Sequence, residues 1–406
     1  KMGIKNFFKK DELKLLWPFY VDALILSLFF IYPAFYIIYM RDIGLSLTQI
    51  GFLTSALALP FILFEIPTGA IADIFGRKFS TVLGIFLSGI VMISIMFFTN
   101  FYILLMIFFV WGAVGTLKSG AGEAWIVDLL KHEKRKELIH EYYVKIPSFY
   151  SIALLLSGII GAFLVKKFGL GIIWPISGIS VIFTSIFFLF GEEHFTRKKQ
   201  HIKEHTHDLI SHIKESLNYC MKNRNLLLMI SAGLFGGLII NFSMDLTWYP
   251  FLQGLGFKNY WFGYLFSATC LVGIFVPYMI KPLVNRVGKY KDYLVIISSL
   301  MFILLFIVGF INSLFLSLAI FILYISAYDF FRPARNVLVQ KFIPSKKRAT
   351  ILSIESMALS VVMIIGAPLA GFFADKIGPQ NTIFMSSFIL IPMIILYSKI
   401  KENKIK

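Results

Sequence analysis

Residues 69–78 read GAIADIFGRK, and residues 281–290, which lie 212 positions further along the chain, read KPLVNRVGKY. The two stretches share a glycine, Gly76 in the first and Gly288 in the second, and the same offset aligns residues 44–136 with a second copy without any gap. Identical residues in this alignment include the pairs Gly44 and Gly256, Gly51 and Gly263, Leu53 and Leu265, Ser55 and Ser267, and Asn100 and Asn312. The basic cluster at 134–136 falls on a second one at 346–348. The chain is therefore an internal duplication.

An apolar composition places this duplicated chain in a membrane. Of its 406 residues, 58% are hydrophobic and only 15% are charged, which is more apolar surface than one soluble core can bury. Apolar stretches of about 18 to 25 residues recur, the length that an α-helix needs to cross a bilayer. We therefore predict an all-α membrane protein with twelve transmembrane helices, at 15–40, 48–73, 79–98, 101–129, 144–165, 170–191, 225–252, 259–280, 292–311, 313–338, 350–374 and 380–399. Two similar multi-helix halves in a membrane are the layout of a secondary transporter, with the substrate site between them.

The net charge of +17 is better explained by membrane topology than by binding to nucleic acid. If the N-terminus is cytoplasmic, nearly all basic residues fall in cytoplasmic segments, as the positive-inside rule requires. The outer loops then carry only Arg41, Lys166, Lys167, Lys258 and Lys376. We expect a multi-pass protein of the cell membrane, embedded in the lipid bilayer with both termini in the cytoplasm, and no nucleic acid partner. The first apolar segment is too long for a signal peptide, so we expect it to be the first spanning helix.

A polar segment divides the chain into a six-helix half at 1–191, a cytoplasmic linker at 192–224 and a second six-helix half at 225–406. Helical spacing of Leu209, Ile213 and Leu217 predicts an amphipathic helix in the linker. The linker also carries His194, His201, His205, His207 and His212. A His-rich tract can bind metal, but this spacing matches no defined site, so we expect neither a metal nor a cofactor. Cys220 and Cys270 have no obvious partner, and we expect no disulfide.

The stretch at 69–78 resembles the signature loop of the major facilitator superfamily. The residues in place are Gly69, Asp73, Gly76, Arg77 and Lys78. With the twelve-helix count, the duplication and the linker, the resemblance covers the whole chain and implies two pseudo-symmetric six-helix halves that work by alternating access. In the family, the matching acid and arginine form a charge network with an acid at the cytoplasmic end of helix 4, here Asp128, and close the inner gate. The alternative is that Arg77 and Lys78 only anchor the loop at the lipid headgroups.

The second copy of the loop departs from the family pattern. Lys281 replaces the first glycine, Asn285 the aspartate and Lys289 the arginine, and Gln340 stands opposite Asp128. We therefore expect the N-terminal half to carry the stronger electrostatic gate.

The sequence of helix 5 supports proton antiport only in part. Proton antiporters of the family carry a glycine-proline motif there. This chain has the small residues Ser157, Gly158, Gly161 and Ala162, but it lacks the proline.

Nine ionisable side chains fall inside predicted spanning segments, where each costs about 2.5 to 3.5 kcal/mol and is by default functional or paired. They are Asp22, Glu65, Lys118, Glu123, Asp245, Asp329, Arg332, Arg335 and Glu355. The resemblance implies that helices 1, 4, 7 and 10 line the central cavity, and six of the nine lie on helices 1, 4 and 10. The carboxylates at 22, 65, 123, 329 and 355 all lie about 7 to 14 Å from the cytoplasmic ends of their helices, which predicts a charged inner vestibule.

Asp22 is the acid that we favour as a proton or cation site, because its helix faces the cavity and no base lies one turn away. The alternative for it is a salt bridge with Lys118 or Arg332. Glu123 is a second candidate for this proton or cation site. The alternatives for it are an ion pair with Lys118 or a position near the lipid headgroups. Asp329 and Arg332 are three residues apart on one helical face, which favours a local ion pair.

Glu65 precedes Pro67 in helix 2, and we interpret it as pairing with another helix, with proton carriage as the alternative. Asp245 lies near the predicted outer surface, where water can solvate it. A desolvated carboxylate has a raised pKa, as a proton carrier near neutral pH requires.

Aromatic residues make up 17% of the chain, and those on the cavity-type helices include Phe19, Tyr32, Trp111 and Trp248. A cavity that combines aromatic rings with acids suits lipophilic, often cationic molecules. Arg332, Arg335 and Lys118 leave anionic or zwitterionic substrates open.

These features predict a monomeric, proton-coupled exporter of small amphipathic or cationic molecules, resembling multidrug efflux members of the family. Its partners would be protons and a small-molecule substrate. The first alternative is a proton-coupled symporter that takes up a nutrient, metal or metabolite, and the second is a non-transporting membrane sensor or scaffold. The sequence has no Walker loop, nucleophile motif or metal constellation, so we expect no enzyme and no catalytic residues.

Overall fold

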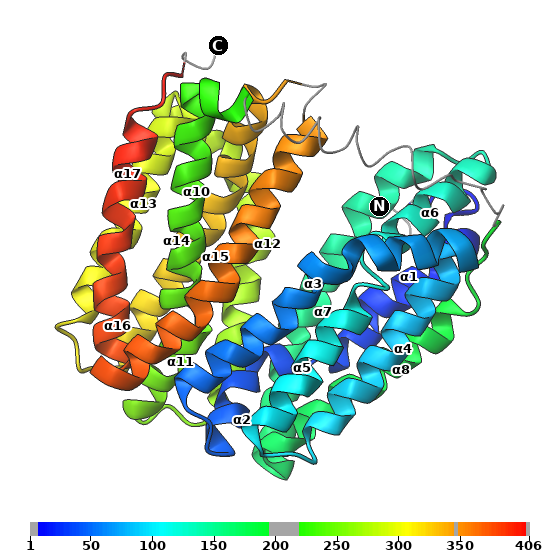
Figure 1. The fold of residues 1–406 in the computed structure, drawn as a ribbon, viewed down its shortest axis with the longest axis horizontal. Coiled ribbons are helices and arrows are strands. Elements are labelled where there is room, and N and C mark those ends of the chain that lie inside the picture. The colour runs from blue at the N-terminus through cyan, green and yellow to red at the C-terminus, as the bar shows by residue number, and fades with distance from the viewer. Residues whose placement is uncertain (1–6, 195–218, 345–347, 403–406) are drawn as a thin grey trace. The chain divides into compact units, whose positions relative to one another are not determined.

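The structure is a computed structural model that describes residues 7–194, 219–344 and 348–402. These residues form helices joined by short turns, and no strand occurs among them (Figure 1). The amphipathic helix predicted around 209–217 lies outside the described residues.

The N-terminal copy of the repeat forms a first group of helices. In chain order these are α1 (Glu12–Leu24), α2 (Tyr36–Asp42), α3 (Leu47–Phe75), α4 (Arg77–Ile95), α5 (Phe101–Gly115), α6 (Ala121–His132), α7 (Glu137–Phe168) and α8 (Ile173–Phe188). Two 3-10 turns, Leu26–Phe29 and Tyr32–Ala34, connect α1 to α2, and a third, Leu170–Ile172, precedes α8.

The C-terminal copy forms a corresponding group. It contains α10 (Arg224–Phe242), α11 (Asp245–Gly254), α12 (Trp261–Val287), α13 (Tyr290–Val308), α14 (Leu314–Phe342), α15 (Arg348–Ile377), α16 (Pro379–Ser386) and α17 (Leu390–Ser398). A 3-10 turn, Ser387–Ile389, joins α16 to α17.

The helices of the described residues agree with the predicted spanning segments. Ten candidate spans are long and apolar enough to cross a membrane by themselves. α12 passes the same test as a pair of segments, Trp261–Val276 and Tyr278–Val287, bent by 62°. α5 is apolar but, with 15 residues, shorter than these candidate spans. Each of the twelve predicted segments thus has a helical counterpart, and the all-α membrane fold is confirmed.

The duplication is visible in the backbone as well as in the sequence. Gly44 and Gly256 have φ angles of 93° and 91°, and Gly76 and Gly288 have φ angles of 104° and 88°. Such angles are strained for residues with a Cβ atom, which explains why both copies keep glycine at these turns.

The chain forms two compact units whose borders do not follow the repeat. Unit 1 comprises residues 1–44, 56–199 and 258–271, and unit 2 comprises residues 45–55, 200–257 and 272–406. α3 therefore begins in unit 2 and ends in unit 1, whereas α12 begins in unit 1 and ends in unit 2. The two exchanged segments, 45–55 and 258–271, correspond closely under the repeat offset.

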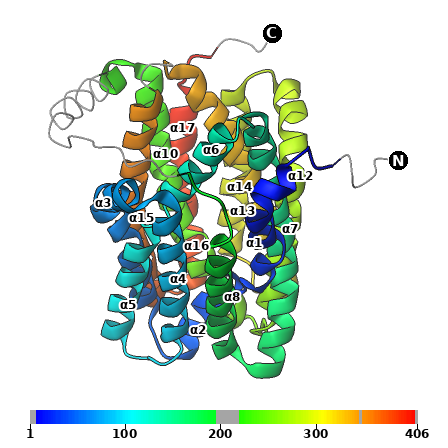
Figure 2. The ribbon, with the colours of Figure 1, turned by 90° about the vertical axis from the view of Figure 1, so that its right-hand side faces the viewer.

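Small residues and aromatic clusters hold unit 1 together. α4 runs beside α8 (Figure 2), and a Cβ atom added to Gly89 would lie 2.7 Å from the carbonyl oxygen of Gly178. Such close approach is how helices associate where no hydrophobic effect drives them together. Phe19, Trp125 and Phe188 pack edge-to-face or tilted against one another in the core of the same unit.

Unit 2 is built mainly from the helices of the second copy. Within it α10 packs against α15 and α17, and α13 packs against α14 and α17 (Figure 1).

Candidate functional site

A cavity of about 660 Å³ lies inside unit 1, between helices of the N-terminal copy. Its volume is typical of small-molecule sites, which span about 300 to 1,000 Å³. The charged residues that line it are Asp22, Lys118 and Glu123, and the hydroxyl-bearing ones include Ser27, Thr81, Ser88, Ser119, Tyr142, Tyr150, Ser180 and Thr184. Aromatic walls come from Phe19, Phe30, Trp111 and Phe188. Three of the sequence-predicted site residues thus share one cavity.

Asp22 is held on the cavity wall by a neutral partner. Its Oδ1 atom accepts a hydrogen bond of 2.6 Å from the hydroxyl of Thr184 on α8, and its backbone carbonyl accepts one of 2.8 Å from Ser27. Among the described residues of unit 1 it forms no ion pair with Lys118, although both side chains line the same cavity. The hydrogen-bond partner of this carboxylate is thus a neutral hydroxyl rather than a base.

Helix 4 is broken at the cavity. α5 ends at Gly115, α6 begins at Ala121, and Gly120 between them has a φ of 66°. Lys118 lies in the break and Glu123 in the first turn of α6, where the helix dipole favours a negative charge. The prediction of one continuous helix at 101–129 is therefore wrong. The glycines of the run GTLKSGAGE at 115–123 are the sequence signal that could have indicated the break.

The corresponding helix of the second copy is continuous. α14 runs from Leu314 to Phe342 without interruption, although it contains Pro333. The broken helix is thus a feature of the N-terminal copy, and interrupted helices in transporters typically border substrate or ion sites.

Thr81 on α4 presents a buried hydroxyl to the same cavity. Its side chain is 1% exposed, and its Oγ1 atom is buried without a hydrogen-bond partner among the described residues. Gly122 of α6 lies close by, because a Cβ atom added to it would lie 3.6 Å from the Thr81 methyl group. An unpaired buried hydroxyl is uncommon and marks a position where a guest molecule can supply the missing partner.

The signature loop closes on α6 through one ion pair. The Arg77 guanidinium binds the Asp128 carboxylate at 2.5 Å, and Gly76 supplies the turn before α4. Asp73 is exposed, and its side chain has no recorded polar contact within the described residues. The structure therefore joins Arg77 to Asp128 and leaves Asp73 outside the pair, whereas Gly69 is an exposed position with open space around it.

Glu193, which the sequence reading missed, completes the binding of this loop. Its Oε1 atom accepts a hydrogen bond of 2.9 Å from the backbone N–H of Lys78, and the Lys78 ammonium donates to the carbonyl oxygen of Leu189. Lys78 is thus bound to the end of α8 and the residues that follow it rather than to an acidic side chain.

The charges of the second copy are arranged differently from the prediction. Arg335 on α14 binds Glu355 on α15 in a largely buried ion pair. Asp329 and Arg332 form no ion pair in the described part of the chain, so their expected local pairing is not found. All four of these residues lie in unit 2.

Two further predicted residues do not line the cavity of unit 1. Glu65 is exposed on α3, without a recorded ion pair among the described residues. The side chain of Asp245 lies outside what the structure describes.

A buried charge cluster near the N-terminus was also missed. Glu12, fully buried, accepts hydrogen bonds from the Lys145 ammonium at 2.7 and 2.9 Å, from the Tyr20 hydroxyl at 2.6 Å and from the Lys9 backbone N–H at 2.7 Å. Lys145 also binds the carbonyl oxygen of Phe7 at 2.7 Å. The cluster binds residues 7–12 to α7.

The exchanged helix starts make equivalent contacts in the two units. In unit 2, the Ser55 hydroxyl donates to the carbonyl oxygen of Ile364 on α15 at 2.5 Å. In unit 1, the Ser267 hydroxyl donates to the carbonyl oxygen of Leu155 on α7 at 2.5 Å. Ser55 and Ser267 are one of the aligned pairs of the repeat, so the duplicated serine has a duplicated role.

Asp375 adds a second contact to the start of α3. Its carboxylate accepts hydrogen bonds from the backbone N–H groups of Leu47 and Thr48, at 3.0 and 2.8 Å, and from the Thr48 hydroxyl. These N–H groups are the unpaired donors of the first turn of α3, so a residue of the second copy caps a helix of the first.

The sequence is similar to that of known proteins along most of its length. The Major Facilitator Superfamily profile matches residues 23–361. The uncharacterized MFS-type transporter YxaM of Bacillus subtilis (strain 168) is 26% identical over 390 residues, covering 93% of this chain and 94% of that protein.

Solved structures show the same fold. The nucleoside transporter NupG superposes with a TM-score of 0.77 at 14% identity, over 98% of this chain and 100% of that one. A D-xylose-proton symporter superposes with a TM-score of 0.65 at 14% identity, over 96% of this chain and 98% of that one. At such identities the likeness concerns the fold alone.

Proposed function

The chain belongs to the Major Facilitator Superfamily, a family of transporters, and we propose that it exports small amphipathic or cationic molecules in exchange for protons. The halves 1–191 and 225–406 would alternate the access of a central site between the two sides of the cell membrane. The substrate and protons would be its only partners, and no enzymatic step is involved.

The observation that carries this proposal is Asp22 on the cavity wall, hydrogen-bonded to Thr184 instead of to a base. Protonation of such a carboxylate removes a charge that an apolar surrounding disfavours. A cationic substrate competes for the same negative charge. Binding of a proton and binding of the substrate thus exclude each other at Asp22, which is the logic of exchange.

The remaining lining supports the substrate class. Asp22 and Glu123 outnumber the single base Lys118 among the charged lining residues, so the cavity is negative when both acids are ionised. Phe19, Phe30 and Trp111 offer ring faces that attract organic cations.

The gate of the proposed cycle is the Arg77–Asp128 pair at the signature loop. The pair is partly exposed, so it can open and reform at little cost. Asp73 would join it only in another state of the cycle. On the other side, the hydrogen bonds of Ser55, Ser267 and Asp375 at the starts of α3 and α12 would serve as the opposing gate.

A second candidate function is proton-coupled uptake of a polar molecule. The unpaired Thr81 hydroxyl, together with the serine hydroxyls of the lining, favours a substrate with hydrogen-bonding groups. The proteins of similar fold include a nucleoside transporter and a D-xylose-proton symporter, in keeping with this alternative.

The test is transport of a lipophilic cationic dye into everted membrane vesicles under an imposed proton gradient. We expect the native chain to accumulate the dye, Asp22→Asn to abolish accumulation, and Asp42→Asn, an exposed acid at the end of α2, to leave it unchanged. Absence of dye transport by the native chain would refute the export proposal. Proton flux measured during addition of nucleosides and pentoses then separates the symport alternative, because only a symporter alkalinises the substrate side.

A further inference from the structure

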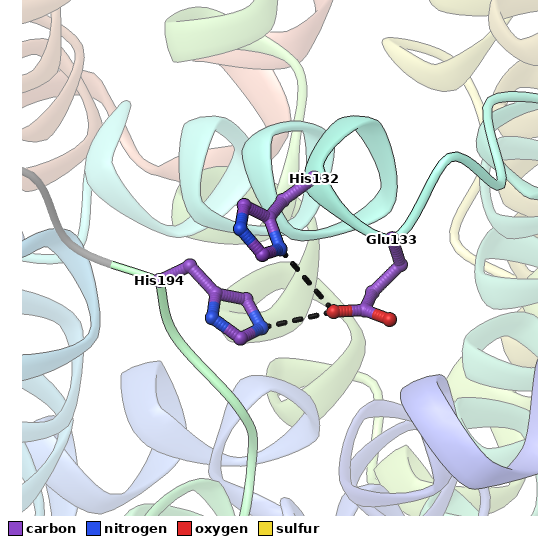
Figure 3. Close-up of side chains that lie close together, drawn as sticks. All are labelled: His132, Glu133 and His194. Atoms are coloured by element: carbon purple, nitrogen blue, oxygen red, sulfur yellow. Dashed lines mark hydrogen bonds and ion pairs between the residues drawn. The ribbon is translucent and has the colours of Figure 1, made fainter.

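Three side chains on the cytoplasmic end of unit 1 point toward one another outside the cavity (Figure 3). His132 is the last residue of α6, Glu133 follows it, and His194 lies in the segment after α8. Oε1 of Glu133 lies 3.3 Å from Nδ1 of His132 and 2.9 Å from Nε2 of His194. The two imidazole rings stack with their centroids 3.7 Å apart. Both ring nitrogens therefore face the same carboxylate oxygen.

These atoms are the ligands that zinc prefers. One ligand atom from each residue can be chosen so that all three lie within 4.8 Å of one another. Imidazole nitrogen and carboxylate oxygen bind zinc at about 2.0 to 2.2 Å, which in a tetrahedral site separates the ligand atoms by about 3.3 Å. The observed separations of 3.3 and 2.9 Å from the carboxylate oxygen are close to that spacing, and the two stacked rings must turn apart so that both nitrogen lone pairs face one ion.

The surroundings leave these atoms available to an ion. Glu133 stands in the basic run KHEKRK at 131–136, yet its carboxylate faces two imidazoles and no lysine in the described part of the chain. The side chains of His132, Glu133 and His194 are 57%, 33% and 40% exposed, so a cytoplasmic ion can reach them. Three protein ligands leave the fourth tetrahedral position to water.

The residues next to the cluster bind the signature loop. Asp128, which pairs with Arg77, precedes His132 by one helical turn on α6. Glu193, which accepts from the Lys78 N–H, directly precedes His194. The indole N–H of Trp125 donates to the carbonyl oxygen of Glu192 at 2.8 Å. Residues 192–194 therefore lie between α6 and the loop.

We propose that His132, Glu133 and His194 form a zinc(II) site that fastens the start of the cytoplasmic linker to the end of α6, beside the signature loop. The site is independent of the transported substrate and of proton coupling. The proposal differs from the expectation of no metal only at this cluster, and it does not include the remaining linker histidines.

The first experiment measures zinc binding to the full-length protein purified without a polyhistidine tag. Calorimetry should give one high-affinity Zn²⁺ per chain, and Co²⁺ should give the visible absorption bands of a tetrahedral N/O site. Loss of a residue that only hydrogen-bonds to a metal ligand weakens metal binding by about 10 to 100-fold. His132→Gln and His194→Gln should each weaken zinc binding by more than this, because each removes a ligand itself. Because His194 lies outside any helix, its substitution is the less disruptive of the two.

Two controls make the result specific. His140→Gln, an exposed histidine on α7, should leave the zinc affinity unchanged. Joint replacement of His201, His205, His207 and His212 by glutamine should also leave it unchanged. If that joint replacement removes the binding, or if the native chain binds zinc no more tightly than His194→Gln, the proposal is overturned.

A second measurement tests the fastening itself. Zn²⁺ should slow amide hydrogen exchange at residues 128–133 and 192–194 in the native chain and not in His194→Gln. Equal exchange with and without Zn²⁺ in the native chain would refute the structural role of the site.

Discussion

Replacing Lys145 by methionine should destabilise unit 1 more than any exposed lysine could. The Lys145 side chain is 8% exposed and its ammonium contacts Glu12, Glu141 and the carbonyl oxygen of Phe7 at 2.7 to 3.0 Å. Methionine fills a similar volume but leaves the fully buried Glu12 carboxylate without its counter-ion. The substitution also removes two of the four hydrogen bonds that Glu12 accepts.

The expected loss follows from this geometry. Removing one partner of a buried ion pair lowers the free energy of unfolding by about 3 to 5 kcal/mol, because the other charge stays buried without a counter-ion. Units of about 150 to 250 residues lose about 2 to 4 °C of melting temperature per kcal/mol. Lys145→Met should therefore lower the apparent Tm by about 6 to 20 °C.

The assay is thermal unfolding in detergent, followed by tryptophan fluorescence and by the loss of the monodisperse gel-filtration peak. Lys167→Met, an exposed position at the other end of the same helix, is the matched control and should change the Tm by less than about 2 °C. Adding Glu12→Leu to Lys145→Met should recover part of the loss, since no unpaired charge then remains buried. If Lys145→Met lowers the Tm no more than Lys167→Met does, the reasoning is refuted.

Three further outcomes are expected. Arg77→Asp and Asp128→Arg should each reduce vesicle transport by about tenfold, and the double exchange should restore part of it, as a coupling of about 0.5 to 3 kcal/mol allows; equal defects in all three would contradict the pairing. Gly158→Ala should lower the Tm through an overpacking cost of about 1 to 3 kcal/mol, because its Cβ atom would lie 2.4 Å from a carbonyl oxygen of α12, whereas Gly171→Ala, in open space, should not. Asp375→Ala should cost about 1 kcal/mol by uncapping α3, seen as a small Tm shift, and an unchanged Tm would argue against the cap.

The sequence predicted the fold because membrane helices are encoded locally. Long apolar runs, the 212-residue offset and the glycines at 76 and 288 each depend on neighbouring residues or on direct repetition. The break at Gly120 was missed because the window 101–129 stays apolar on average even where its backbone turns.

The site was harder to predict, because its contacts join residues far apart in the chain. Asp22, Lys118 and Glu123 were singled out by their charge in apolar segments, but only the fold shows that they share a cavity with Thr81 and Thr184. Hydroxyl residues are common in membrane helices and carry no signal of their own. The partners Glu12 and Lys145 are separated by 133 positions, and Lys145 stands at the edge of an apolar run, where it looks like a headgroup anchor.

The proposed zinc site at His132 could not be predicted from sequence spacing either. The sequence reading looked for metal ligands within the linker, whereas the cluster combines one linker histidine with two residues from the end of α6. The adjacency of these two segments depends on how α6 and the end of α8 pack.

Because α3 and α12 each begin in one unit and end in the other, the linker is not the main connection between the two units. The polypeptide passes between units 1 and 2 at 44–45, 55–56, 199–200, 257–258 and 271–272, so the linker is one crossing among several. A protease cut near residue 200 should thus produce two fragments that migrate together until a detergent harsh enough to separate α3 from α15 and α7 from α12 is added. In a protein with a single connecting peptide, cutting that peptide separates the domains, whereas here α3 and α12 each belong to both units and would still link the fragments.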